Sequence, residues 1–227
     1  DLADQKYMTV SNTFQMACDT DEESIFNIAL GAGGENGSAI TDQHRICIDN
    51  IVLEKTSAPE IDVPVGKNLI TNSEFEMSED GSLAGWENAV TAPGDATFEA
   101  GDGKITYSVE NVGEADWNIQ LKQMGLSLEQ GESYTLKCTL VSDVDRVVKV
   151  AVMTPSAGYA WHGGEDVVLT AGEAKDVTLT ITPKEEVFTD GITVDTGAGL
   201  FFSMGYVEGY TLGAHTVSIS NVSFVKN

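Results

Sequence analysis

Two pairs of adjacent carboxylates, Glu165 with Asp166 and Glu185 with Glu186, are the first residues in this sequence that could do chemistry. Hydrolysis of a glycosidic bond, for example, needs two carboxyl groups that flank the bond. Adjacent residues on a strand point to opposite faces, so neither pair can straddle a bond. The sequence also has no Ser–His–Asp signature, phosphate-binding glycine loop or metal-binding histidine pair. We therefore predict no catalysis and expect both pairs on the solvated surface.

Aromatic side chains near glycines are the next candidates. Tyr159 and Trp161 lie two residues apart in a turn-rich segment that ends in Gly163-Gly164. Two exposed aromatics are costly unless they bind something, although one of them could instead cap the core. We expect Tyr159 or Trp161 to contact a ligand, and Tyr206, in a glycine-rich loop, to lie at the edge of the same site. Flat apolar rings combined with amide groups suit ring-shaped ligands that carry hydroxyl groups.

Amide side chains follow a third tryptophan in the run Trp117-Asn118-Ile119-Gln120-Leu121. Asn118 and Gln120 alternate with Ile119 and Leu121, so they are predicted to face the side opposite the core. On that side their amide groups could bond the hydroxyls of a ligand. Trp117 has the parity of Ile119, which favours a place in the core. Strand ends often break alternation, so a binding role for Trp117 remains an alternative to the core position.

The charge of the chain limits its partners. The sequence has 36 acidic and 12 basic residues, a formal net charge of -24, and no run of Lys and Arg. A polyanion without a basic patch is a poor partner for nucleic acid or for an anionic membrane. Neutral ligands remain, and neutral sugars are the largest class of neutral polymer that a secreted protein meets. Because the chain opens at Asp1 without a signal peptide, we interpret it as an excised piece of a longer protein.

Short alternating runs indicate the elements that must position these residues. Residues 134–140, 177–181 and 217–220 alternate apolar with polar side chains, and turn signals separate them. No segment keeps a helical apolar period for three turns. The predicted fold is therefore all-β, an antiparallel β-sandwich or a barrel. Cys138 shares the apolar parity of its strand, so we expect a small buried hydrophobe.

An internal repeat divides the chain. An apolar strand, a glycine, a loop and a strand that starts with histidine occur twice, with the histidines at His44 and His215. Each copy closes on Asn followed by Ile or Val. Convergence of similar strands is the alternative, but matched loops, histidines and asparagines argue against it. We interpret residues 1–57 as the closing strands of an upstream module, 58–67 as a linker, and 68–227 as a complete module.

The order of motifs in the second module points to a known family. The motifs are Asn68-Leu69-Ile70, Asn72, Phe75-Glu76, Gly85-Trp86, Trp117 to Leu121, Leu128 to Tyr134, Phe202 to Gly205 and Val217 to Val222. With them, residues 68–227 resemble the carbohydrate-binding modules of families 4 and 9, which are related to the jelly rolls of families 16 and 22. The resemblance implies a two-sheet jelly roll whose cleft binds one polysaccharide chain, with Trp117 and Gln120 at the cleft and Trp86 in the core.

The same resemblance implies a function. Ligands of the family are β-glucans with β-1,3, β-1,4 or mixed linkage, and xylan, and its modules usually flank glycoside hydrolase domains of secreted enzymes. We therefore expect a non-catalytic module, secreted to the extracellular space or the cell surface, that binds β-glucan. A xylan-binding module of the same fold is the alternative. A structural spacer without a ligand is a third reading, which burial of Trp117, Tyr159 and Trp161 would support.

A structural calcium ion is also implied by the resemblance, near Asn72 and Glu76 at the start of the module and close to its last strand. The family's closing motif usually has Asp before Asn. The upstream copy keeps this residue as Asp49, whereas the complete module has Ser220. Ca²⁺ takes about six to eight oxygen ligands, carboxylates among them, so this departure bears directly on the calcium prediction.

The upstream segment lacks partners within its own residues. About three strands cannot enclose a core that needs about eight. Residues 1–57 could pack on the complete module, on the same segment of another chain, or on a second polypeptide that completes the upstream module. The complete module has its own copies of these strands, which argues against the first arrangement. We favour the second polypeptide, because the alternation in residues 1–57 matches half of a normal sandwich whose other half is missing. A Cys18–Cys47 disulfide is possible in this segment, but no framework spacing supports it.

Overall fold

The computed structural model describes residues 48, 51–52, 63–79, 81–189 and 191–227. The chain divides into two units, and every strand described below belongs to the second, Ile61–Asn227. The predictions made for residues 1–57 lie outside the described residues. They include the closing strands of an upstream module, the Cys18–Cys47 disulfide, the role of His44 and the second polypeptide.

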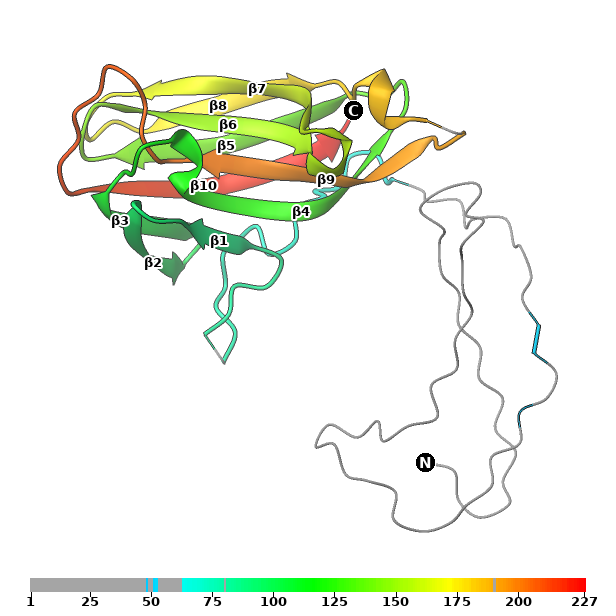
Figure 1. The fold of residues 1–227 in the computed structure, drawn as a ribbon, viewed down its shortest axis with the longest axis horizontal. Helices are drawn as coiled ribbons and strands as arrows, with labels where there is room; N and C mark the ends of the chain where they lie inside the picture. The colour runs from blue at the N-terminus through cyan, green and yellow to red at the C-terminus, as the bar shows by residue number, and fades with distance from the viewer. Residues whose placement is uncertain (1–47, 49–50, 53–62, 80, 190) are drawn as a thin grey trace, which may run out of the picture. The chain divides into compact units, whose positions relative to one another are not determined.

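Two five-stranded antiparallel sheets form the second unit, and its long strands lie side by side in Figure 1. The first sheet has the order β1-β4-β9-β6-β7, and the second has the order β2-β3-β10-β5-β8. The strands are β1 Glu87–Val90, β2 Asp95–Gly101, β3 Lys104–Asn111, β4 Ile119–Glu129, β5 Tyr134–Ser142, β6 Arg146–Thr154, β7 Ala160–Leu169, β8 Lys175–Ile181, β9 Val194–Ser203 and β10 His215–Lys226. The described residues contain no α-helix, only the 3₁₀ turns η1 Asp116–Asn118, η2 Pro155–Ala157 and η3 Glu185–Val187.

Alternation along the strands builds the core between the sheets. In β5, Tyr134, Leu136, Cys138 and Leu140 are buried, while the residues between them are at least partly exposed. In β4, Ile119 and Leu121 are fully buried. Burying these side chains releases about 25 cal/mol per Å² of apolar surface, the main force that holds the sheets together. The all-β antiparallel sandwich predicted from the sequence is confirmed, and its strand order is that of a jelly roll.

Two single residues of this core were also predicted correctly. Cys138 is buried and free, and its burial raises the pKa of the thiol to about 12, so it remains protonated and apolar. Trp86 is buried, and its ring lies 5.1 Å from that of Phe75, measured between centroids. Its indole N–H donates to the carbonyl oxygen of Asn72 at 3.0 Å, which satisfies the one polar group of the ring.

The closing motif contains a β-bulge. Strand β10 changes register on β5 between Ser220 and Ser223, and Asn221 there has a φ of 53°. Asparagine tolerates this left-handed conformation better than most residues, which explains why a bulge of this geometry suits Asn. The Asn221 amide donates to the hydroxyl of Thr139 at 3.1 Å on the neighbouring strand. The bulge thus sets the register of the two halves of β10.

Contacts with the sandwich begin before residue 68. Val63 is 2% exposed, and its N–H donates to the carboxylate of Glu129 at 3.0 Å. Val65 forms a bridge with Lys226, and the N–H of Gly66 donates to the Lys226 carbonyl at 3.1 Å. Residues 63–67, which were assigned to a linker from the sequence, therefore pack against the last strand.

Candidate functional site

The outer face of the sheet β1-β4-β9-β6-β7, hereafter the aromatic face, gathers the candidate residues. Strand register places its side chains in rows across the sheet. One row holds Ala89, Gln120, Ser203, Lys149 and Asp166. The next holds Glu87, Lys122, Phe201, Ala151 and Gly164, and a third holds Met124, Gly199, Met153 and Trp161. The first and third rows are four residues apart along β6, about 13 Å at 3.3 Å per residue.

At one end of this face, Trp161 lies over a glycine. A Cβ built on Gly164 would lie 2.6 Å from Cζ2 of Trp161, so the indole occupies the space that a side chain would fill. Gly164 is thus required by close approach. Trp161 is 41% exposed, and Tyr159, just after the 3₁₀ turn η2, is 62% exposed. Both rings are therefore available to a ligand at the end of the sheet where β6 turns into β7.

At the other end, Trp117 and Tyr206 lie on adjoining segments. The N–H of Gly205 donates to the Asp116 carbonyl at 2.9 Å, and that of Tyr206 donates to the Ala115 carbonyl at 3.1 Å. Gly205, like Gly164, must be glycine, because a Cβ at this position would collide with the Ala115 carbonyl oxygen. Trp117 is 54% exposed and Tyr206 is 39% exposed. The alternative that parity offered for Trp117, a place in the core, is excluded because the residue lies in η1 and not in β4.

The two amides predicted beside Trp117 have different surroundings. The Gln120 side chain lies on the aromatic face, where its amide N–H donates to the hydroxyl of Ser203 at 2.9 Å. Asn118 is 2% exposed. Its side-chain oxygen accepts from the backbone N–H groups of Glu114 and Ala115, and its amide donates to the Thr91 carbonyl. Asn118 therefore holds the loop before β4 in place and does not face a ligand, since η1 breaks the alternation on which that prediction relied.

A pocket of about 250 Å³ opens at the Trp117 end of the aromatic face. Its walls are Ala115, Asp116, Val147, Lys149, Asp166, Tyr206, Val207 and Glu208. Lys149 forms an ion pair with Asp116, which ties η1 to the middle of the sheet. The Asp116 hydrogen bond raises the pKa of Lys149, and nearby Asp166 adds to that effect. The ammonium group therefore stays charged and fixed to one wall of the pocket.

Behind this pocket, Arg146 is fully buried without a carboxylate partner among the described residues. Its guanidinium donates to the carbonyls of Met204 and Gly205 and to Nε2 of His215. His215 Nδ1 lies 2.7 Å from the Gly213 carbonyl, so this nitrogen carries the proton and Nε2 accepts. Burial lowers the pKa of Arg146 to about 10, still far above neutral pH. The charged guanidinium of Arg146 thus fixes the backbone of Met204 and Gly205, which precedes Tyr206.

Beneath Trp161, a buried histidine forms a similar anchor. The N–H of Lys184 donates to Nδ1 of His162 at 3.0 Å, so this nitrogen is unprotonated. Nε2 then donates to the hydroxyl of Thr154 at 2.8 Å, and Thr154 donates to the carboxylate of Asp195. Burial lowers the pKa of His162, although Asp195 and Glu186 act in the opposite direction. A buried, neutral histidine therefore supports each end of the aromatic face, His215 at the Trp117 end and His162 at the Trp161 end.

These two histidines predict a pH dependence of stability. Burial is the main cause of the lowered pKa of both His162 and His215, below the ordinary 6.5, so protons bind the unfolded chain more readily. Stability is therefore fully present above pH 6.5 and is lost as the pH falls through the folded pKa values. We expect the free energy of unfolding in urea to fall between pH 7.5 and 5.5. A His162→Gln, His215→Gln double variant serves as the control and should lose this slope; a flat profile in the parent chain would contradict the assignment.

The carboxylate pairs do not form a catalytic arrangement. Glu165 and Asp166 are exposed and adjacent on β7. Glu185 and Glu186 are also exposed, but they lie in the 3₁₀ turn η3 and not on a strand. The oxygen of the Glu185 carboxylate accepts from the Gln130 amide at 2.7 Å. Both pairs are on the surface, as the sequence predicts.

Both oxygens of Asn72, at the predicted calcium site, already accept hydrogen bonds. The side-chain oxygen of Asn72 accepts from the N–H of Glu76 at 2.9 Å, and its backbone carbonyl accepts from Phe75 and Trp86. Among the described residues, no three His, Cys, Asp or Glu side chains converge as a metal site. Asn72 and Glu76 alone therefore supply fewer free oxygens than the about six to eight that Ca²⁺ takes.

Calcium at this position stays a prediction from the sequence. From the donor groups present, we expect the melting temperature to be the same with and without a chelator. Thermal unfolding in excess EGTA, and again after adding back calcium chloride, measures this directly. A melting temperature that falls with EGTA and recovers with calcium would show that a site exists despite the present arrangement.

Several residues of the aromatic face were not found from the sequence. Lys149, Asp116 and Met124 carry no motif, and Ser203 lies in the motif Phe202 to Gly205 but was given no site role. Strand pairing and the Asp116–Lys149 ion pair bring them to this face. The Gly163-Gly164 doublet was a usable signal, because paired glycines after an aromatic residue mark a close approach.

A sandwich whose outer sheet face combines exposed aromatic rings with amides and hydroxyls defines a sugar-binding module. A family model described as a carbohydrate binding domain, of families 4 and 9, matches residues 67–196. This is more than half of the chain, and the chain belongs to that family. It is a family of non-catalytic binding modules, so this part of the chain binds carbohydrate and is not itself an enzyme. Comparison with curated protein sequences gives no match.

Solved structures share the fold. A structure described as "CBM4 structure and function" is 19% identical with a TM-score of 0.55, and the match covers 70% of this chain and 99% of that one. The N-terminal cellulose-binding domain of Cellulomonas fimi β-1,4-glucanase C is 20% identical with a TM-score of 0.50, covering 71% and 98%. An arabinose-bound α-L-arabinofuranosidase is 11% identical with a TM-score of 0.51, covering 71% of this chain but 27% of that one.

Within the described part of the chain, no helix is long and apolar enough to cross a membrane.

Proposed function

We propose that residues 63–227 bind a single chain of β-glucan, with β-1,3, β-1,4 or mixed linkage, along the aromatic face. The observation that carries the proposal is the placement of exposed aromatic rings at both ends of one sheet face. Trp117 and Tyr206 lie at one end, and Tyr159 and Trp161 at the other. Aromatic rings provide flat apolar surfaces for the C–H faces of sugar rings.

The residues between the two ends suit hydroxyl groups. Gln120 and Ser203 carry polar groups, and Ala151 beside them has a small side chain, whereas Trp161 and Met124 fill the spaces over Gly164 and Gly199. Phe201 lies on the same floor, 4% exposed. This mixture of polar and apolar groups suits a chain of linked sugars that lies across the sheet, with ordered water completing its hydrogen bonds.

A spacer without a ligand is the alternative from a different class. It is favoured only if the aromatic residues are buried in the core, and Trp117, Tyr159 and Trp161 are 54%, 62% and 41% exposed. Xylan is the alternative within the same class. A cellulose-binding domain is among the similar structures, which favours a glucan. The xylan alternative is decided by direct binding.

Affinity electrophoresis tests the proposal. Gels that contain laminarin, barley β-glucan, hydroxyethylcellulose or xylan should retard the protein most strongly on one of the glucans. We expect micromolar to millimolar dissociation constants, about 4 to 8 kcal/mol. Because these ligands are neutral, retardation should change little between low and high salt. Strong retardation by xylan alone would replace β-glucan with xylan, and no retardation in any gel would overturn the proposal.

The same proposal implies a biological setting. A module that binds polysaccharide without cleaving it can act by holding an attached glycoside hydrolase close to its substrate. We therefore propose that this chain is part of a secreted, polysaccharide-degrading protein that acts outside the cell or at its surface. The match to about a quarter of an arabinofuranosidase chain is consistent with a module fused to an enzyme. Full-length protein and a variant lacking residues 63–227 would be compared for hydrolysis of insoluble glucan.

A further inference from the structure

The pocket at the Trp117 end of the aromatic face carries a net negative charge. Three of its eight lining residues, Asp116, Asp166 and Glu208, are acidic, and Lys149 is the basic one, which gives a formal charge of -2. The other charged pair on this face, Glu87 with Lys122 at 2.9 Å, is neutral in sum. Negative charge on the face is therefore concentrated in one pocket.

Lys149 is not free to bind an acidic group. Its ammonium is bonded to the carboxylate of Asp116, and strand register places Asp166 directly beside it on β7. A carboxylate that enters the pocket would have to break an existing ion pair and approach the two remaining acidic groups. Charges a few Å apart at a partly exposed site still interact strongly, because the effective dielectric constant there is far below that of water.

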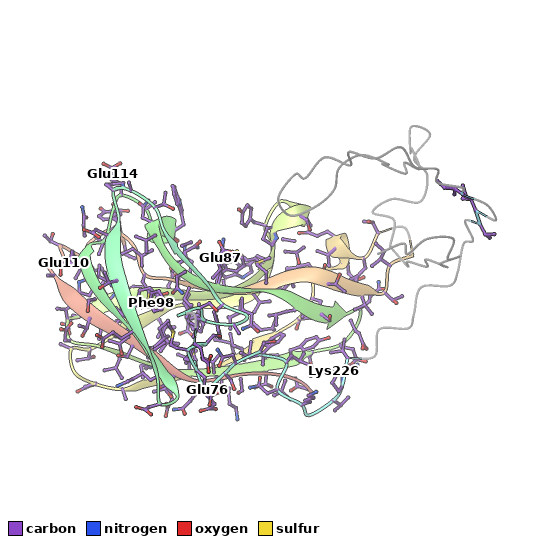
Figure 2. All side chains as sticks on the ribbon, turned by 90° about the horizontal axis from the view of Figure 1, so that it is seen from below. Glu76, Glu87, Phe98, Glu110, Glu114 and Lys226 are labelled. Carbon is purple, nitrogen blue, oxygen red and sulfur yellow. The ribbon has the colours of Figure 1, made fainter. Side chains whose placement is uncertain are left out.

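A sugar bound at this end reaches the pocket. Tyr206 is one of the lining residues, and Trp117 follows Asp116 directly in η1. A ring stacked on Tyr206 would therefore have substituents within reach of Asp166 and Glu208. Figure 2 shows Glu110 and Glu114 at the end of the sandwich that holds the β3–β4 connection, the connection that also supplies Ala115 and Asp116 to the pocket. These carboxylates add charge of the same sign nearby.

We propose that this pocket excludes uronic acids, so that the module selects uncharged polysaccharides and rejects acidic ones with the same backbone. The inference rests on the proposed function, because it concerns how a chain bound on the aromatic face is chosen. Asp166 and Glu208 are the specificity-determining residues, whereas the pairing of Asp116 with Lys149 keeps the one cation in the pocket from attracting a carboxylate.

Two cellulose derivatives with the same β-1,4-glucan backbone provide the test. Hydroxyethylcellulose is neutral and carboxymethylcellulose is acidic. In affinity gels at low salt, we expect the protein to bind carboxymethylcellulose about tenfold more weakly. An Asp166→Asn, Glu208→Gln double variant should recover several-fold of that loss, measured as the ratio of its affinities for carboxymethylcellulose and hydroxyethylcellulose. Both side chains are exposed, so the variant should keep its fold.

A matched variant separates the pocket from the charge of the whole chain. Asp102→Asn with Glu186→Gln removes two exposed carboxylates in the β2–β3 turn and in η3, away from the pocket. It should leave the preference as it is. The inference would be overturned if the parent protein bound both derivatives equally, or if the matched variant recovered binding of carboxymethylcellulose as well as the pocket variant does. Either result would leave the proposed function standing. Failure to bind any neutral polysaccharide would overturn the proposed function, and this inference with it.

Discussion

Alanine in place of Trp117 is expected to weaken binding of β-glucan by about ten- to a hundredfold, because truncation of a tryptophan that anchors a ligand costs 2 kcal/mol or more. The indole is 54% exposed and contributes little to the core, so the melting temperature should change little. Isothermal titration with barley β-glucan measures the affinity, and thermal unfolding checks the fold. Alanine at Trp161 should act in the same direction from the other end of the sheet.

Val65→Ala is the matched control for this experiment. Val65 is 67% exposed and bridges Lys226, a residue of the other sheet, so it removes exposed apolar surface away from the aromatic face. Its affinity for β-glucan should equal that of the parent protein. If Trp117→Ala also binds as tightly as the parent protein, then Trp117 is not part of the site and the ligand would have to lie toward Tyr159 and Trp161.

Methionine in place of Arg146 is expected to lower the free energy of unfolding by about 3 kcal/mol. The substitution removes the donor from four acceptors, on Val147, Met204, Gly205 and His215, and each buried acceptor left unpaired costs about 1–3 kcal/mol. Removal of a desolvated guanidinium acts in the opposite direction. We expect the lost hydrogen bonds to outweigh it, since Arg146 makes several bonds at once. Urea unfolding at pH 7.5 measures the difference.

Lys149→Met, on the same strand, is the comparison for Arg146. Its ion pair with Asp116 is partly exposed, with side-chain exposures of 35% and 27%. Pairs of this kind contribute about 0–1 kcal/mol, so this variant should lose little stability. An Arg146→Met variant as stable as Lys149→Met would mean that the cost of burying the guanidinium cancels its bonds. In that case Arg146 would serve the position of Tyr206 more than the stability of the fold.

The strands were predictable because apolar and polar residues alternate along them, and the apolar ones are the residues that the fold buries. Tyr134 to Leu140 alternate, and the alternation corresponds directly to burial in β5. The order of strands in the two sheets was accessible only through the family resemblance, since pairing of β4 with β9 joins residues far apart in sequence. The bulge at Asn221 appears in the sequence only as a motif, and its left-handed backbone gives that motif a physical reason.

The aromatic residues of the candidate site could be predicted from the sequence, whereas its charged residues could not. Tyr159, Trp161 and Tyr206 were found because glycines flank them, and all three are exposed. Asn118 was misplaced because a single 3₁₀ turn shifts the phase of the residues before β4. The pairing of Asp116 with Lys149 could not be predicted, since nothing local to either residue signals the contact.

The position of β10 determines when this domain can fold as it is synthesised. Strand β10, His215–Lys226, is the last of the ten described strands in chain order, yet it lies between β3 and β5 in the middle of its sheet. Until it emerges, the β2-β3 hairpin and the β5-β8 pair have no shared neighbour, and their inner strands keep unpaired edges. Contacts between distant residues also slow folding. The second sheet can therefore close only after residue 226 has left the ribosome.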